Sequence, residues 1–263
     1  MITSYYRPES LSEALERLSQ QDPPAVPLGG GTVLSRQRKP DIAVVDLQRL
    51  GLDKIEQQGQ ALSAGATVRL QQLLEYLYEA KDLPERLRGA LIKSLELEAT
   101  RNLRQVATLA GTVVSCGGRS PFITALLALD PKLEWAGGEE VPLGDYLPLR
   151  EAFAHLKLMV GVRFSINASL QFEMVARTPA DQPIVCAAVA RWPSGRTRVT
   201  LGGYGKAPVL VMDGPEPGGA AVAAREAYRN AGDEWASAEY RREIAGKLVQ
   251  RMLQESAAGG EVL

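Results

Sequence analysis

Apolar positions recur at helical spacing along several parts of the chain. Between residues 11 and 18 they follow one another at i, i+3, i+4 and i+7, just after the helix-capping residue Ser10. An almost wholly apolar run at 122–130 is typical of a buried helix. Further amphipathic helices are expected at 69–80, 84–105, 219–230 and 238–256.

Short runs rich in β-branched residues and bounded by glycine or proline predict strands. Residues 131–147 read as a hairpin that turns at the glycine pair 137–138, and residues 107–122 as a strand followed by a glycine loop. After residue 166 the pattern changes to three strands of an antiparallel meander, at 170–177, 183–193 and 196–211. The remaining strands are expected at 24–30, 41–47, 61–68 and 157–166.

Two glycine-rich segments each follow a predicted strand, at 29–31 and at 110–118. Glycine lets backbone N–H groups approach a ligand closely, and successive N–H groups form a concavity that holds a phosphate. Tight turns also need glycine, so both interpretations stay open at this point. The spacing is neither G-x-G-x-x-G nor G-x-x-x-x-G-K-[ST], which disfavours a Rossmann or P-loop nucleotide site.

Composition narrows the classes of function. The chain has 263 residues, is 45% hydrophobic and carries a net charge of −1, which argues against a nucleic-acid-binding surface. We expect no transmembrane segment, no signal peptide and a cytoplasmic location. The only cysteines, Cys116 and Cys186, are expected to be reduced thiols, although one disulfide remains an alternative. The single histidine, His155, is expected at the surface or at a helix end.

An ordered set of motifs extends over nearly the whole chain. It consists of RPESLSEALERL at 7–18, PLGGGTVL at 27–34, PDIAVVDLQRL at 40–50, TRNLRQVATLAGTVVSCGGRSPFITALLALDPKLE at 100–134, and SAEYRREIAGKLVQRML at 237–253. These segments resemble the FAD-binding medium subunit of molybdenum hydroxylases, of the carbon monoxide dehydrogenase and xanthine dehydrogenase flavoprotein family. The resemblance implies an α+β fold: a two-lobed FAD-binding fold of the vanillyl-alcohol oxidase type, then a C-terminal α+β domain with a three-stranded antiparallel sheet and helices.

The resemblance also implies domains and site residues. The N-terminal αβ lobe would cover 1–55, the second αβ lobe 56–165 and the C-terminal domain 166–263. Backbone amides of the first glycine loop would bind the FAD diphosphate, and the second loop would lie beside the ribityl and isoalloxazine groups. The candidate cofactor-binding residues are Gly29, Gly30, Gly31, Thr32, Val33, Thr108, Gly111, Thr112, Ser115, Arg119 and Ser120.

By the same resemblance, the chain would be the electron-transfer subunit of a larger oxidoreductase. A small partner subunit would carry the [2Fe–2S] clusters and a large one the molybdopterin, while this chain would hold FAD and neither a catalytic side chain nor a metal. Asp46, which ends a predicted strand, is expected to serve as a turn or cap. Tyr204 would lie either near the flavin ring or in the core or an interface.

The chain departs from the family pattern mainly in the second loop. Ala110 replaces a glycine, Gly117 and Gly118 replace Ser-Pro or Asp-Pro, and Pro121 replaces an acidic residue. Each lost polar contact costs about 1 kcal/mol. An alternative function therefore follows, in which the chain keeps the fold as a flavin-free scaffold or assembly subunit.

Overall fold

The computed structural model describes residues 2–36, 41–153 and 158–258 and divides the chain into two compact units. The first unit contains residues 1–75, 100–115 and 132–164, and the second contains residues 76–99, 116–131 and 165–263. His155 lies outside the described residues. The domain boundaries expected at residues 55 and 165 remain a prediction.

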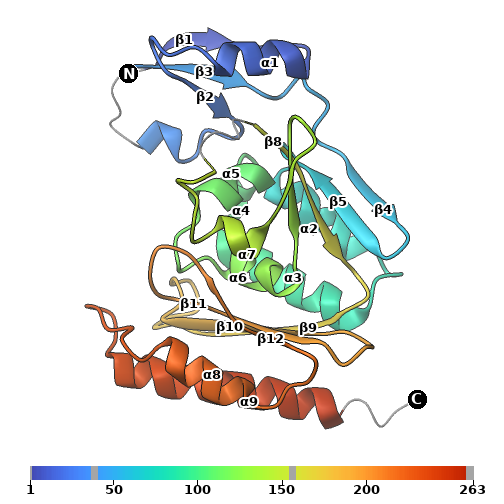
Figure 1. Ribbon diagram of the computed structural model, residues 1–263, viewed down its shortest axis with the longest axis vertical. Helices are drawn as coiled ribbons and strands as arrows, with labels where there is room; N and C mark the ends of the chain where they lie inside the picture. The colour runs from blue at the N-terminus through green and yellow to red at the C-terminus, as the bar shows by residue number, and fades with distance from the viewer. Residues whose placement is uncertain (1, 37–40, 154–157, 259–263) are drawn as a thin grey trace. The chain divides into compact units, whose positions relative to one another are not determined.

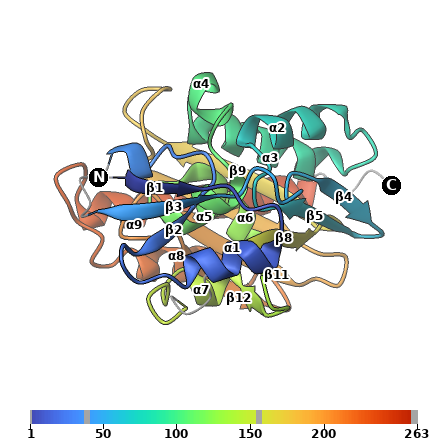
Figure 2. The same cartoon turned by 90° about the horizontal axis from the view of Figure 1, so that it is seen from above.

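The first unit begins with a small parallel sheet. Its strands are β1 (Ile2–Tyr6), β3 (Ile42–Asp46) and β2 (Ala25–Leu28), in that order across the sheet. Helix α1 (Leu11–Leu18) lies next to these strands, as Figure 2 shows, and buries Ala14 and Leu18 in a core with Val45. The side chain of Ser10 caps α1 by accepting a hydrogen bond from the backbone of Glu13, as the sequence predicts.

A second, five-stranded sheet completes the first unit. Its strand order is β4 (Ile55–Gln58), β5 (Ala61–Gly65), β8 (Met159–Ser165), β6 (Lys132–Trp135) and β7 (Glu140–Pro142). The predicted hairpin is the pair β6–β7, with Gly137 and Gly138 at positive φ in its turn. The short helical elements of this unit are η1 (Leu34–Arg36), α4 (Arg101–Arg104), α5 (Leu109–Ser115) and α7 (Leu143–Tyr146). Helix α2 (Leu70–Glu79) runs from the first unit into the second.

The second unit is a three-layer arrangement around an antiparallel sheet (Figure 1). The strands are β12 (Val209–Gly214), β11 (Thr197–Gly202), β10 (Val185–Arg191) and β9 (Ser169–Val175), in that order. Helices α3 (Glu85–Glu98) and α6 (Pro121–Ala128) cover one face of this sheet, and α8 (Ala220–Ala227) and α9 (Ala238–Ala258) cover the other. The inner strand β10 is buried almost throughout, which explains its continuous apolar run.

The α+β fold class is confirmed, with four local corrections. The strand predicted within 107–122 is wrong, because residues 109–115 form helix α5 with Leu109, Ala110 and Val113 buried. The C-terminal sheet has four strands rather than three, since residues 196–211 hold β11 and the start of β12. The helix expected over 84–105 is divided into α3 and α4 by an extended residue, Ala99. Strands β1 and β4 were not predicted.

Both cysteines are buried, and neither is part of a disulfide. Burial raises the pKa of Cys186 to about 12, and its thiol donates a hydrogen bond to the Thr124 hydroxyl. In the described part of the chain, no helix combines the length and apolar character needed to cross a membrane.

Candidate cofactor site

The first glycine loop leaves the carboxyl end of β2, where Leu28 pairs with Asp46 at the end of β3. Strands β1, β2 and β3 are all parallel, so their carboxyl ends lie at the same edge of the sheet. Ligands of parallel sheets commonly bind outside this edge. The loop is therefore placed where a ligand site is expected on topological grounds.

The three successive glycines have two different structural causes. A Cβ added to Gly30 would lie 1.7 Å from the carbonyl oxygen of Val106, and one added to Gly29 would lie 2.5 Å from the Thr108 hydroxyl oxygen. Residues 106–108 therefore pack directly against the backbone of the loop. Gly31 has φ = +69°, a backbone conformation that residues other than glycine rarely adopt.

Two carbonyl groups of the loop, those of Gly29 and Gly31, accept hydrogen bonds in the described part of the chain, whereas none of its amides donates one there. Leu28 O accepts from Leu47 N at 3.1 Å, and Gly31 O accepts from Ser35 N at 3.1 Å. Gly29 O accepts from the Gln48 side-chain amide at 3.5 Å. Within the described residues, none of the backbone N–H groups of 29–33 has an acceptor. The loop is thus a row of unpaired donors, the arrangement that binds an oxyanion such as a diphosphate.

The amides at the start of the second glycine segment are, by contrast, already used. Leu109 N donates to Val68 O, Ala110 N to Ala66 O, and Gly111 N to the Thr108 hydroxyl at 3.3 Å. Thr108 is 2% exposed and caps α5 in this way. The amides of Leu109, Ala110 and Gly111 are therefore not available to a ligand, and residues 106–108 pack against the first loop.

Two polar residues of α5 are engaged with their own helix. The Thr112 hydroxyl donates to Thr108 O at 2.8 Å, and the Ser115 hydroxyl donates to Gly111 O at 2.6 Å. Such bonds to the carbonyl four residues earlier are common for Ser and Thr inside helices. The structure thus gives both side chains a local role.

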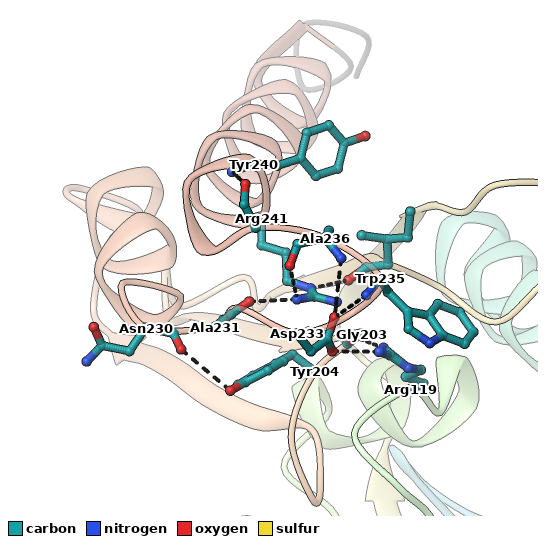
Figure 3. A network of polar contacts seen from close by, with 12 residues as sticks. Arg119, Gly203, Tyr204, Asn230, Ala231, Asp233, Trp235, Ala236, Tyr240 and Arg241 are labelled. Carbon is teal, nitrogen blue, oxygen red and sulfur yellow. Dashed lines mark hydrogen bonds and ion pairs between the residues drawn. The ribbon is translucent and has the colours of Figure 1, made fainter.

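Arg119 belongs to a polar network in the second unit (Figure 3). Its guanidinium donates to Gly203 O and to Asp233 Oδ2, the latter at 2.7 Å, and lies 4.1 Å from the ring centre of Trp235. Asp233 Oδ1 in turn accepts from the fully buried Arg241 at 2.7 Å. Although burial opposes the effect, the hydrogen bond from Arg241 lowers the pKa of Asp233 to about 2.

Backbone hydrogen bonds beside the same network join Gly118 to the segment 203–205. Gly118 N donates to Gly205 O at 3.1 Å, and Gly203 N donates to Gly118 O at 2.7 Å. Tyr204, which lies between Gly203 and Gly205, packs edge-on against Tyr228 with ring centres 6.3 Å apart. Arg119 therefore fixes the shape of the chain around residues 117–119.

Ser120 caps helix α6 and contacts a buried carboxylate. Its hydroxyl oxygen accepts from Ile123 N at 3.2 Å and its proton is donated to Glu98 Oε2 at 2.7 Å. Glu98 Oε2 also accepts from Phe122 N at 2.9 Å. Burial raises the pKa of Glu98, although both hydrogen bonds act in the opposite direction.

The structure thus brings together part of the predicted set. Gly29, Gly30, Thr108 and Gly111 are neighbours in the first unit, whereas Arg119 and Ser120 belong to the second. Sequence reasoning missed Gln48, which contacts Gly29 O. The sequence indicated Gln48 only through its position two residues after Asp46, in the turn predicted there. The carboxylate of Asp46 accepts a hydrogen bond from Gln48 N in this turn.

Comparison with known proteins supports a specific assignment. Residues 1–164 match the model of a family described as the FAD binding domain in molybdopterin dehydrogenase. The chain is also 28% identical to the uncharacterized protein YgfM of Escherichia coli strain K12, over 99% of each chain.

Solved structures share the fold. A chain of quinoline 2-oxidoreductase from Pseudomonas putida 86 has a TM-score of 0.76 and 24% identity, covering 97% of each chain. A chain of carbon monoxide dehydrogenase from Oligotropha carboxidovorans has a TM-score of 0.74 and 22% identity, covering 94% of this chain and 95% of that one. A chain of the Hydrogenophaga pseudoflava enzyme has a TM-score of 0.73 and 22% identity, covering 95% and 96%.

Proposed function

Because the chain belongs to the family of FAD-binding domains of molybdopterin dehydrogenases, we propose that it is the FAD-binding electron-transfer subunit of a multi-subunit molybdenum hydroxylase. The observation that carries the proposal is the row of amides at Gly29, Gly30, Gly31, Thr32 and Val33, which have no acceptor among the residues that the structure describes. A dinucleotide diphosphate is the anion that fits such a row beside the carboxyl edge of a parallel sheet.

The residues of the chain have a binding and orienting role in this proposal. Bound FAD supplies the one- and two-electron chemistry, and the protein supplies position and electrostatics. The amides of 29–33 would bind the diphosphate, and the segment 106–108, which packs against Gly29 and Gly30, would support them. Direct cofactor contacts by Thr112, Ser115, Arg119 and Ser120 remain predictions from the resemblance, since each side chain already has a partner within the chain.

The proposed partners are a small subunit with [2Fe–2S] clusters and a large subunit with molybdopterin. Electrons would enter this chain from the iron–sulfur clusters and leave to an external acceptor. The alternative, a flavin-free scaffold or assembly subunit, is favoured by one observation: the amides of Leu109, Ala110 and Gly111 are bonded internally and offer nothing to a cofactor.

The first experiment is a titration of the purified full chain with FAD and, separately, with ADP. Flavin fluorescence and calorimetry report binding, and ADP isolates the contribution of the diphosphate from that of the flavin ring. The proposal expects saturable binding of both ligands at one site, with ADP competing against FAD. If the folded chain bound neither FAD nor ADP, this result would support the alternative function as a flavin-free scaffold or assembly subunit.

The second experiment isolates the tagged chain with its native partners. The proposed role expects FAD, molybdenum and iron in fixed stoichiometry in one complex. A complex that contains molybdenum and iron but no flavin would contradict electron transfer through this chain. A chain that binds FAD but copurifies with no metal would contradict the proposed partners and leave FAD binding intact.

A further inference from the structure

The carboxylate of Asp46 connects residues 5–7 with the turn at 46–48, at the carboxyl edge of the parallel sheet. It is 5% exposed and accepts hydrogen bonds from the Tyr5 hydroxyl and, at 3.0 Å, from Gln48 N. The Arg7 guanidinium lies 3.4 Å from the same group. The hydrogen bond to Asp46 raises the pKa of Tyr5, so that this hydroxyl remains a donor over the neutral range.

The turn that Asp46 holds is the one that engages the carbonyls of the glycine loop. Leu47 N donates to Leu28 O at 3.1 Å, and the Gln48 side chain donates to Gly29 O at 3.5 Å. In a planar trans peptide the C=O and the following N–H point in opposite directions. Fixing these two carbonyls therefore turns the N–H groups of Gly29 and Gly30 away from residues 47–48.

We propose that Asp46 is a positioning residue for anion binding: by fixing the turn at Leu47–Gln48, it aims the amides of Gly29 and Gly30 at the diphosphate. Asp46 does not touch the ligand in this proposal. Its negative charge would repel a phosphate if exposed, but the carboxylate is buried, bonded to Tyr5 and Gln48 N, and paired with Arg7. The inference rests on the proposed function of the same loop.

The test compares Asp46→Asn with a matched exposed carboxylate, Glu9→Gln. Glu9 also pairs with an arginine, Arg49, at 2.8 Å, and among the described residues its carboxylate shares no hydrogen bond with Leu47 or Gln48. Binding of FAD and of ADP is measured on the full chain, at a temperature at which circular dichroism shows each variant fully folded. We expect Asp46→Asn to weaken both ligands about tenfold, the effect of about one misdirected hydrogen bond, and Glu9→Gln to change them less than twofold.

A second variant covers the case in which Asp46→Asn does not fold. Gln48 is exposed, so Gln48→Leu removes the donor to Gly29 O with little effect on folding. It should weaken ADP about threefold while leaving the melting temperature unchanged, a split that a merely structural role would not produce. Asp46→Asn binding ADP as tightly as the wild type, or more tightly because a negative charge is gone, would overturn the positioning role. If the wild type binds neither FAD nor ADP, the proposed function itself fails.

Discussion

The α-carbon of Gly30 packs against the carbonyl oxygen of Val106 so closely that a Cβ would lie 1.7 Å from it. This oxygen belongs to the backbone and cannot rotate away. Gly30→Ala should therefore displace one of the two segments. We expect a loss of about 1–3 kcal/mol in the free energy of unfolding, as for overpacking of a core, and a loss of FAD binding. Urea unfolding and FAD titration measure the two effects.

Gly89 offers the matched control. It lies in helix α3, is exposed, and a Cβ added there would meet no atom within 4 Å. Gly89→Ala should stabilise the protein by about 0.5–1 kcal/mol, because glycine loses more backbone entropy on folding than alanine. If both alanine variants changed stability by the same amount, the contact between Gly30 and Val106 would not be the cause.

Two neighbouring arginines should differ sharply in their effect on stability. Arg241 is fully buried and donates to Ile184 O, Ala231 O, Ala236 O and Asp233, whereas the side chain of Arg242 is 48% exposed and pairs only with Glu226 in the described contacts. Arg241→Met should cost about 3–5 kcal/mol, because it removes a buried guanidinium that donates to three carbonyls and to Asp233, although Asp233 keeps its bond from Arg119. Arg242→Met should stay within about 0.5 kcal/mol. Equal losses in chemical denaturation would contradict a structural role for the network in Figure 3.

Glu98 should make stability fall as the pH rises. Burial raises its pKa in the folded chain above the usual value of 4.5, so the folded state binds this proton more tightly than the unfolded state. The stabilisation is present below pH 4.5 and is lost as the pH passes through the raised pKa, with a slope of at most about 1.4 kcal/mol per pH unit. Glu98→Gln retains an acceptor for Ser120 and Phe122 but does not titrate.

The measurement for Glu98 is the difference in unfolding free energy between wild type and Glu98→Gln at several pH values from 5 to 8. We expect the wild type to lose stability relative to the variant across this range. A difference that stays constant, or that favours the wild type at high pH, would show that the carboxylate is not penalised by burial.

The thiol of Cys186 should be unreactive in the folded chain. It is 0% exposed and burial raises its pKa to about 12, whereas the thiolate is the reactive form. In native buffer at pH 8, a disulfide reagent should label Cys186 no faster than the chain unfolds. In denaturant, the same reagent should label it at once. Rapid labelling in buffer would mean that strands β10 and β11 open locally.

Sequence periodicity predicted most elements that are amphipathic or wholly buried, such as α1, α9 and β3. It failed at residues 109–115, where a run of Thr and Val suggested a strand although Thr108 caps a helix. It also missed β1 and β4, which lie at sheet edges and lack a continuous apolar run. The turn between β11 and β12 was absorbed into one predicted strand.

The sequence predicted the glycine loop after β2 but not the contacts that require its glycines; that this loop binds a cofactor stays a prediction. Three consecutive glycines identified the loop, because their lack of side chains is a local property. The packing of Val106 and Thr108 against Gly29 and Gly30 is a contact between distant parts of the sequence, which no local pattern encodes. The partners of Arg119 at Gly203 and Asp233 are equally distant, so nothing in the sequence indicated them when Arg119 was included among the candidate cofactor-binding residues.

The support beneath the glycine loop comes from residues 106–108, which a ribosome adds long after residues 29–33. During synthesis the loop therefore lacks its backing until the later segment has emerged and folded against it. A nascent chain cut short before residue 106 would expose the glycines as a flexible stretch with no fixed direction for their amides. Binding of a dinucleotide by this loop would consequently begin only after residues 106–108 have left the ribosome.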